Sequence, residues 1–255
     1  MSKYPITIDG ESVWIGTAAE LSVALDVLQG QRDRQVLTQL QPHLARVIPR
    51  AKDFMAVMKS LSPDDQVFLI EALGPDLAGI LEDAAHMRDL LATLAEEKVE
   101  IALLKMLGPD GLRALLLTAP EAAEVLEWVY GQTDQLALDL LGLDYIRRLL
   151  RNADDLAALL RSLDNALQEK LIDQLGWEFA LGLVRNGRDL AALLRALPAA
   201  VSERLLKHYN RAQLASLIGN AHDWTYLYQR LEPAEAETLI RLLGLKSKGG
   251  KSHAA

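Results

Sequence analysis

The chain contains no cysteine, so disulfide bonds, thiolate catalysis and cysteine-ligated metal sites are excluded. Aromatic residues make up only 5% of its 255 residues, although half of the chain is hydrophobic. The core must therefore consist mainly of Leu, Ala, Val and Ile. Such a core favours thin, closely stacked helices over a β-sandwich, and we expect an all-α protein.

An excess of basic charge is also absent. Lys and Arg number 27 against 35 Asp and Glu, which gives a formal net charge of −8. This balance argues against a dedicated nucleic-acid binder, because phosphate contacts need a basic field. No apolar run approaches the roughly 18 residues of a membrane span, and Met1 to Pro5 does not begin a signal peptide. We expect a cytoplasmic protein without a membrane partner.

The most regular feature of the chain is a ladder of glycines at a constant sequence interval, with asparagine in one slot. Its members are Gly74, Gly108, Gly142, Gly176, Asn210 and Gly244, so that each is 34 positions from the next. The position before each of them is apolar: Leu73, Leu107, Leu141, Leu175, Tyr209 and Leu243. Self-similarity at a fixed period marks a stack of small units that bury their apolar faces against each other.

Apolar residues within one unit follow helical spacing, as in the series Leu156, Leu159, Leu160 and Leu163. Three short helices are predicted in this unit, near 154–163, 165–175 and 177–185. The ladder glycine falls between the second and third helices. We expect it to end the second helix in the left-handed conformation, for which asparagine is the usual substitute.

Most first helices begin with a short polar residue that is followed three positions later by an acid. The pairs are Thr118 and Glu121, Asn152 and Asp155, Asn186 and Asp189, and Asn220 and Asp223. We interpret them as helix caps and not as a ligand ladder. The third unit has Ala84 and Met87 instead, so its first helix is predicted to follow the preceding helix with little break.

The two ends of the chain depart from the repeat. Residues 6–15 alternate apolar and polar around Asp9-Gly10, a pattern typical of a β-hairpin. We expect residues 1–16 to form a hairpin cap with Trp14 as its anchor, and 246–255 to be disordered. Between them, repeats are predicted near 17–49, 50–83, 84–117, 118–151, 152–185, 186–219 and 220–245.

The three-helix unit resembles the armadillo and HEAT class of α-solenoids. This resemblance implies a right-handed solenoid of about seven repeats that offers a concave surface to a protein or peptide. Tetratricopeptide repeats share the period but have two helices. Residues 61–74 are also similar to the opening helix and loop of the DNA-reading TAL-effector repeats, but Leu73 and its equivalents occupy the base-reading position. The resemblance is to an architecture and not to one family.

No catalytic motif is present. The five histidines form no i,i+3 or i,i+4 pair, and residues 248–252 lack the strand and helix of a phosphate-binding loop. The acids Asp64, Asp65, Glu96 and Glu97 are interpreted as favourable charges at helix starts, not as acid–base pairs. We therefore expect no enzyme, no metal site and no cofactor.

Candidate binding residues lie in the C-terminal half of the chain, where 16 Lys and Arg face 13 Asp and Glu after residue 142. Arg161 and Arg195 share a solvent-facing column, and Arg151 and Arg185 share another at the end of the third helices. Solubility accounts for the first pair and helix-dipole complementarity for the second. The alternative is a cationic stripe in the C-terminal half that binds an acidic peptide or other anion. Tyr226 is expected to be exposed, unlike Trp224 and Tyr228 in apolar columns.

The leading hypothesis is a non-enzymatic scaffold or adaptor that binds a protein or peptide on a concave surface, with self-association through an end repeat as an addition. The alternative is nucleic-acid binding along the basic C-terminal half.

Overall fold

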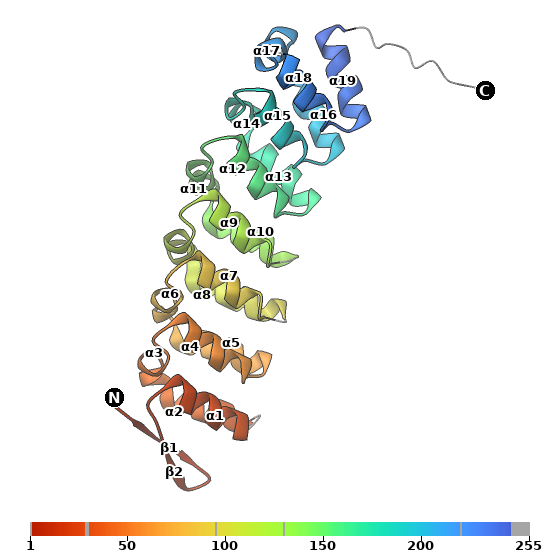
Figure 1. The fold of residues 1–255 in the computed structure, drawn as a ribbon. Helices are drawn as coiled ribbons and strands as arrows, with labels where there is room; N and C mark the ends of the chain where they lie inside the picture. The colour runs from red at the N-terminus through yellow and green to blue at the C-terminus, as the bar shows by residue number, and fades with distance from the viewer. Residues whose placement is uncertain (1, 29–30, 95, 130, 220, 246–255) are drawn as a thin grey trace, which may run out of the picture. The chain divides into compact units, whose positions relative to one another are not determined.

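The computed structural model describes residues 2–28, 31–94, 96–129, 131–219 and 221–245. The expected disorder of 246–255 and the cap at Asn220 lie outside these residues. The chain forms two compact units, 1–145 and 146–255. It is mainly helical and opens with a two-stranded antiparallel hairpin (Figure 1).

The predicted hairpin is confirmed, with strands β1 (Tyr4–Ile8) and β2 (Glu11–Ile15). Asp9 and Gly10 join the strands with φ angles of 51° and 87°. Two consecutive positive φ angles are what the tightest hairpin turn requires. Ile6, Ile8 and Ile15 lie on one face of the hairpin and are buried.

Strand β1 lies on the second helix, and the side-chain amide of Gln39 binds both backbone groups of Thr7. It accepts from the N–H at 2.7 Å and donates to the C=O at 3.0 Å. The prediction that Trp14 anchors the hairpin is wrong, because this side chain is 56% exposed. Trp14 pairs with Pro5 on the face opposite Ile6 and Ile15, since side chains alternate along a strand.

Helices of the same kind pack in sequence in the first unit. The first helices form one row, in which α1 contacts α4, α4 contacts α7, and α7 contacts α9. The second helices form another, in which α2 contacts α5, α5 contacts α8, and α8 contacts α10. The bounds are α1 (Ala18–Leu28), α2 (Gln31–Leu40), the 3₁₀ turn η1 (Gln41–His43), α3 (Leu44–Val47), α4 (Ala51–Lys59), α5 (Pro63–Leu73), α6 (Asp76–Leu81), α7 (Ala84–Leu91), α8 (Glu97–Leu115), α9 (Ala119–Leu126) and α10 (Gln132–Leu141). Helix α8 is kinked at Gly108, which has non-helical backbone angles, and α11 (Leu143–Leu149) runs from the end of the first unit into the second.

The second unit contains the row of first helices again and part of the row of second helices. Helix α12 contacts α15, α15 contacts α18, and α16 contacts α19. The bounds are α12 (Ala153–Arg161), α13 (Asn165–Leu175), α14 (Trp177–Gly182), α15 (Gly187–Leu194), α16 (Ala199–Lys207), α17 (Arg211–Leu217), α18 (Ala221–Tyr228) and α19 (Pro233–Leu243). The three helices predicted between residues 154 and 185 therefore correspond to α12, α13 and α14.

The five ladder glycines all have positive φ, between 54° and 81°. Gly244 alone combines this with the ψ of the left-handed helical region, 25°. The left-handed conformation predicted for the other four glycines is wrong: their φ is positive, but ψ is −131° at Gly74, −173° at Gly108, 145° at Gly142 and 142° at Gly176, so the chain is extended there. The predicted role of Asn210 is wrong. Its φ is −87°, and its side chain instead caps the start of α17 by accepting from the N–H of Gln213.

The predicted caps at Thr118, Asn152 and Asn186 are confirmed, because each side chain accepts from the backbone at the start of its helix. The start of the third repeat, near residue 84, differs from the prediction. Glu82 has a φ of 62°, and Asp83 caps α7 by accepting from the N–H of His86 at 2.9 Å. The break before α7 is thus as definite as the others, and its cap lies one residue early.

Candidate functional site

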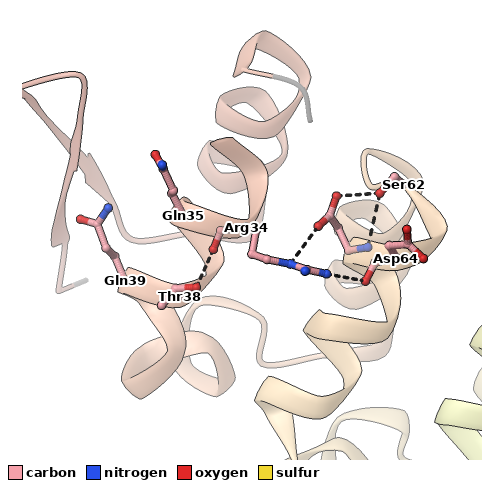
Figure 2. A pocket seen from close by; sticks show the side chains of 7 residues that line it. Arg34, Gln35, Thr38, Gln39, Ser62 and Asp64 are labelled. Carbon is pink, nitrogen blue, oxygen red and sulfur yellow. Dashed lines mark hydrogen bonds and ion pairs between the residues drawn. The ribbon is translucent and has the colours of Figure 1, made fainter. Parts of the chain in front are cut away.

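An open groove of about 620 Å³ lies between α2 and the start of α5 (Figure 2). Both helices belong to the first unit, and every lining side chain is polar or charged. They are Arg34, Gln35, Thr38 and Gln39 on α2, and Ser62, Asp64 and Asp65 at the start of α5. The groove therefore offers many hydrogen-bonding groups.

Ser62 fixes the α5 side of the groove by capping the helix. Its hydroxyl accepts from the N–H of Asp65 at 3.3 Å and donates to the Asp65 Oδ2 at 2.6 Å. Pro63 occupies the first helical position, where proline has no N–H to leave unpaired. Asp64 and Asp65 then lie in the first turn, where the helix dipole favours negative charge.

Arg34 reaches across the groove from α2 to α5 (Figure 2). Its Nε lies 3.5 Å from the Asp65 Oδ1, and its Nη2 donates to the backbone C=O of Asp64 at 3.3 Å. The same guanidinium lies 5.2 Å from the ring centre of Phe68, one repeat period further along the chain. Arg34 thus connects the second helices of two successive repeats.

Asp64 has a second basic neighbour on its other side. The Lys98 Nζ lies 2.7 Å from its Oδ1 and 3.2 Å from the Glu96 Oε2. Hydrogen bonding to Lys98 is the main reason why the pKa of Asp64 lies below its usual value, and the same contact raises the pKa of Lys98. The charges around the groove largely neutralise one another, so the groove has no strong net field.

The charged side chains of the groove form oppositely charged pairs. The acids in the groove face arginine or lysine, and the Glu97 Oε1 accepts from the N–H of Gln132 at 3.0 Å. The exposed amide of Gln35 has no hydrogen-bond partner in the described part of the chain. Over those same residues, no three His, Asp or Glu side chains gather where a metal ion would bind.

A repeated arginine contact, which sequence reasoning missed, connects neighbouring repeats. Arg113, in the last turn of α8, donates to the C=O of Leu141 from Nε at 3.0 Å and from Nη2 at 2.8 Å. These carbonyls end α10, where helices leave acceptors unpaired. Tyr145 makes the reciprocal contact, since its hydroxyl lies 2.8 Å from the C=O of Arg113 and 2.9 Å from that of Leu116 and shares its one hydrogen between them.

The second unit contains the same contact one repeat period later. Arg147 donates to the C=O of Leu175 at 3.0 Å, and its guanidinium lies 5.8 Å from the ring centre of Phe179. Arg113 has the equivalent position over the Tyr145 ring, at 5.7 Å. We call each arginine with its carbonyl and aromatic ring an arginine clamp. The sequence signal that would have found it is the pairing of Arg with an aromatic residue 32 positions on.

All four predicted binding arginines are exposed: Arg151, Arg161, Arg185 and Arg195. None forms an ion pair within the described ranges. Arg151 and Arg185 do not end the third helices, contrary to expectation. They precede the next caps, and their N–H groups donate to Asp155 and Asp189. The structure places the other two, Arg161 and Arg195, at the ends of α12 and α15.

The structure places Tyr226 on α18 between two arginines. The Arg230 guanidinium lies 3.7 Å from its ring centre and that of Arg188 lies 5.4 Å away. Tyr226 is half-buried, whereas Tyr228 is 47% exposed. The expectation that Tyr226 is the more exposed of the two is therefore wrong. Cation–π stacking holds Tyr226 in place.

Comparisons with protein-family models, with curated proteins and with solved structures find no match. Along the described residues, no helix is both long enough and apolar enough to cross a lipid bilayer.

Proposed function

We propose that the chain is a right-handed α-solenoid of about seven three-helix repeats, and that it serves as a non-enzymatic scaffold for a protein or peptide. The observation that carries the proposal is the repeated arginine clamp. Arg113 and Arg147 are one repeat period apart, and so are their carbonyl targets Leu141 and Leu175. Repetition of one contact at the sequence period is what a stack of like modules requires.

The groove between α2 and α5 is the best surface for a peptide. Extended peptides carry N–H and C=O groups at every residue, and these must find partners when they leave water. The open amide of Gln35 supplies both a donor and an acceptor. Because Arg34 and Asp64 are already paired, a peptide can bind beside them without leaving a buried charge uncompensated.

Selection of a displayed peptide library on the full chain tests this role. The enriched peptide is then titrated by calorimetry against the wild type and Gln35→Ala. We expect the variant to bind about fivefold more weakly, the equivalent of one hydrogen bond of about 1 kcal/mol. Gln174→Ala, at an exposed position on α13, is the matched control and should bind as the wild type does. Equal affinity of all three proteins would count against the groove.

Small-angle scattering tests the solenoid separately from the groove. A globular chain of this length has a radius of gyration of about 18 Å. Seven stacked repeats of about 10 Å each predict a larger value, of about 23 Å. A measured value that matches the globular chain rejects the solenoid.

Nucleic-acid binding is the second candidate, because the exposed side chains of Arg151, Arg161, Arg185 and Arg195 form no ion pair among the described residues. Other arginines of this unit are already used, as Arg204 pairs with Glu169 and Asp173. Binding of a labelled duplex and a labelled single strand, measured over a range of salt, tests this candidate. A steep loss of affinity with rising salt would favour this candidate, as would a shallower slope of log affinity against log salt concentration in the double variant Arg161→Ala, Arg195→Ala.

A further inference from the structure

An exposed apolar surface, which shares no lining residue with the polar groove, lies between the hairpin and α1. An open groove of about 540 Å³ runs there, with Val13, Trp14 and Ile15 of β2 on one side. The α1 side consists of the apolar residues Ala19, Val23, Ala24, Val27 and Leu28, together with Glu20. Trp14, Val23 and Val27 are 56%, 63% and 77% exposed. Side chains of this kind are rarely clustered in water without a partner.

The two edges of the hairpin differ in a way that bears on this surface. Thr7 directs its N–H and C=O away from β2, because both groups bind Gln39. Thr7 and Ser12 are therefore a pair without mutual hydrogen bonds, and so are Pro5 and Trp14 two residues on. The outer edge of β1 is closed at both places, once by Gln39 and once by proline, which has no N–H to offer.

The outer edge of β2 is open. By the same alternation, Ser12 and Trp14 direct their N–H and C=O groups away from β1. Neither residue has a hydrogen bond to another strand or side chain within the described residues. Edge strands in natural proteins are usually protected by lysine, proline or a bulge. Strand β2, with the sequence Glu-Ser-Val-Trp-Ile, has none of these protections.

Charge at the rim of the surface indicates the kind of partner. Glu11 shares a strand face with Val13, and Asp26 lies three residues from Val23 on α1. Both acids are exposed and form no ion pair among the residues described. Glu20, in contrast, already pairs with Lys3. Acidic side chains outnumber basic ones by 22 to 11 over positions 1–142, so a second copy would bring two acidic surfaces together.

We propose that β2 is a docking edge for an extended segment of another protein, with alternating apolar residues flanked by Lys or Arg. The segment adds a third strand to the hairpin by pairing with the N–H and C=O groups of Ser12 and Trp14. Its apolar side chains cover Val13, Val23 and Val27, and its basic flanks meet Glu11 and Asp26. Main-chain pairing supplies affinity and the alternate side chains supply specificity.

A synthetic peptide of alternating valine and threonine, with two lysines at each end and a fluorescent label, probes this edge by anisotropy. We expect it to bind the full chain with a Kd below about 1 mM. The same peptide with glutamates in place of the lysines should bind at least about tenfold more weakly. A version N-methylated at every core residue has no backbone donor on either edge, so it cannot pair with a strand and should not bind. Binding by the N-methylated version, or no binding at all, overturns the proposal.

Two variants place the binding site. Ser12→Pro removes one outward N–H and should abolish binding, while the hairpin tolerates proline at this kind of position, as Pro5 shows. Val27→Lys removes the apolar contact on α1 and should also abolish binding. Ala56→Lys, at an exposed apolar position of α4, is the control and should leave binding unchanged. Sedimentation tests the other occupant: a dimer of the chain that Val27→Lys dissociates and the peptide does not displace would replace the proposed partner by a second copy.

Discussion

Removal of the Arg113 side chain is the sharpest test of how the repeats are joined. Arg113 is half-buried, and its best two hydrogen bonds to the Leu141 carbonyl measure 2.8 and 3.0 Å. Hydrogen bonds to a charged donor contribute about 1.5–3 kcal/mol each, and not additively on one acceptor. A cation near a helix C-terminus adds about 0.3–1 kcal/mol. We expect Arg113→Ala to reduce the free energy of unfolding by about 2–3 kcal/mol.

Arg147 and Arg161 provide an internal scale for this measurement. Arg147 makes the same contact in the second unit, but it is exposed and has one hydrogen bond, at 3.0 Å. Its replacement by alanine should cost about 1 kcal/mol. Arg161→Ala removes an exposed arginine without an ion pair in the described residues and should change stability by less than about 0.5 kcal/mol.

Urea unfolding followed by circular dichroism measures the three differences, and amide hydrogen exchange of α10 locates the first of them. Local exchange is needed because repeat arrays need not unfold in one step. Arg113→Lys keeps the charge and loses the planar fork, so it should recover less than half of the loss. If Arg113→Ala and Arg161→Ala unfold alike, or if α10 exchanges as in the wild type, the clamp does not hold the repeats together.

Three further predictions concern single positions. Gly142→Ala should reduce the free energy of unfolding by about 1–3 kcal/mol from the positive φ alone. The loss should exceed that of Gly176→Ala, because the new Cβ at position 142 would lie 3.2 Å from the Arg113 Nη2, whereas nothing lies within 4 Å of a Cβ at position 176. Equal melting temperatures of the two variants would contradict this prediction. Burial raises the pKa of Tyr209, whose hydroxyl has no hydrogen-bond partner in the described structure. Tyr209→Phe should therefore leave the free energy of unfolding unchanged or raise it by up to about 1 kcal/mol. A clearly lower melting temperature of the variant would show that the hydroxyl makes a stabilising hydrogen bond. Lys98 lowers the pKa of Asp64 below its usual 3.8. The pair therefore stabilises the fold above that pH, and the stabilisation is lost as the pH falls through the lowered pKa. The difference in melting temperature between the wild type and Asp64→Asn should shrink below about pH 4, and a difference that does not depend on pH would reject the ion pair.

Local signals predict the helix ends well. The ladder glycines and the caps at Asn152 and Asn186 depend on backbone geometry within a few residues, and short sequence patterns encode such geometry. Asn210 shows where this reasoning fails. Asparagine suits both a positive φ and a helix cap, and only the position of Gln213 three residues later distinguishes the two.

The candidate sites are harder to predict because they depend on contacts between repeats. Arg113 and Tyr145 belong to successive repeats of the sequence, and no helical periodicity connects their positions. The prediction places Trp14 on the wrong side because alternation in a strand identifies two faces but not the one that is covered. In the structure, the isoleucines decide this, since Ile6 and Ile15 are each 1% exposed.

The backbone angles of the ladder glycines also bear on whether the array can be lengthened by engineering. An additional module, copied from 143–176 and inserted after Gly244, needs this residue to rotate its ψ from 25° to the 145° found at Gly142. Glycine makes this rotation at little cost, whereas an alanine at the junction would resist the required combination of angles. Junction glycines are therefore the residues to keep fixed when the rest of a module is redesigned.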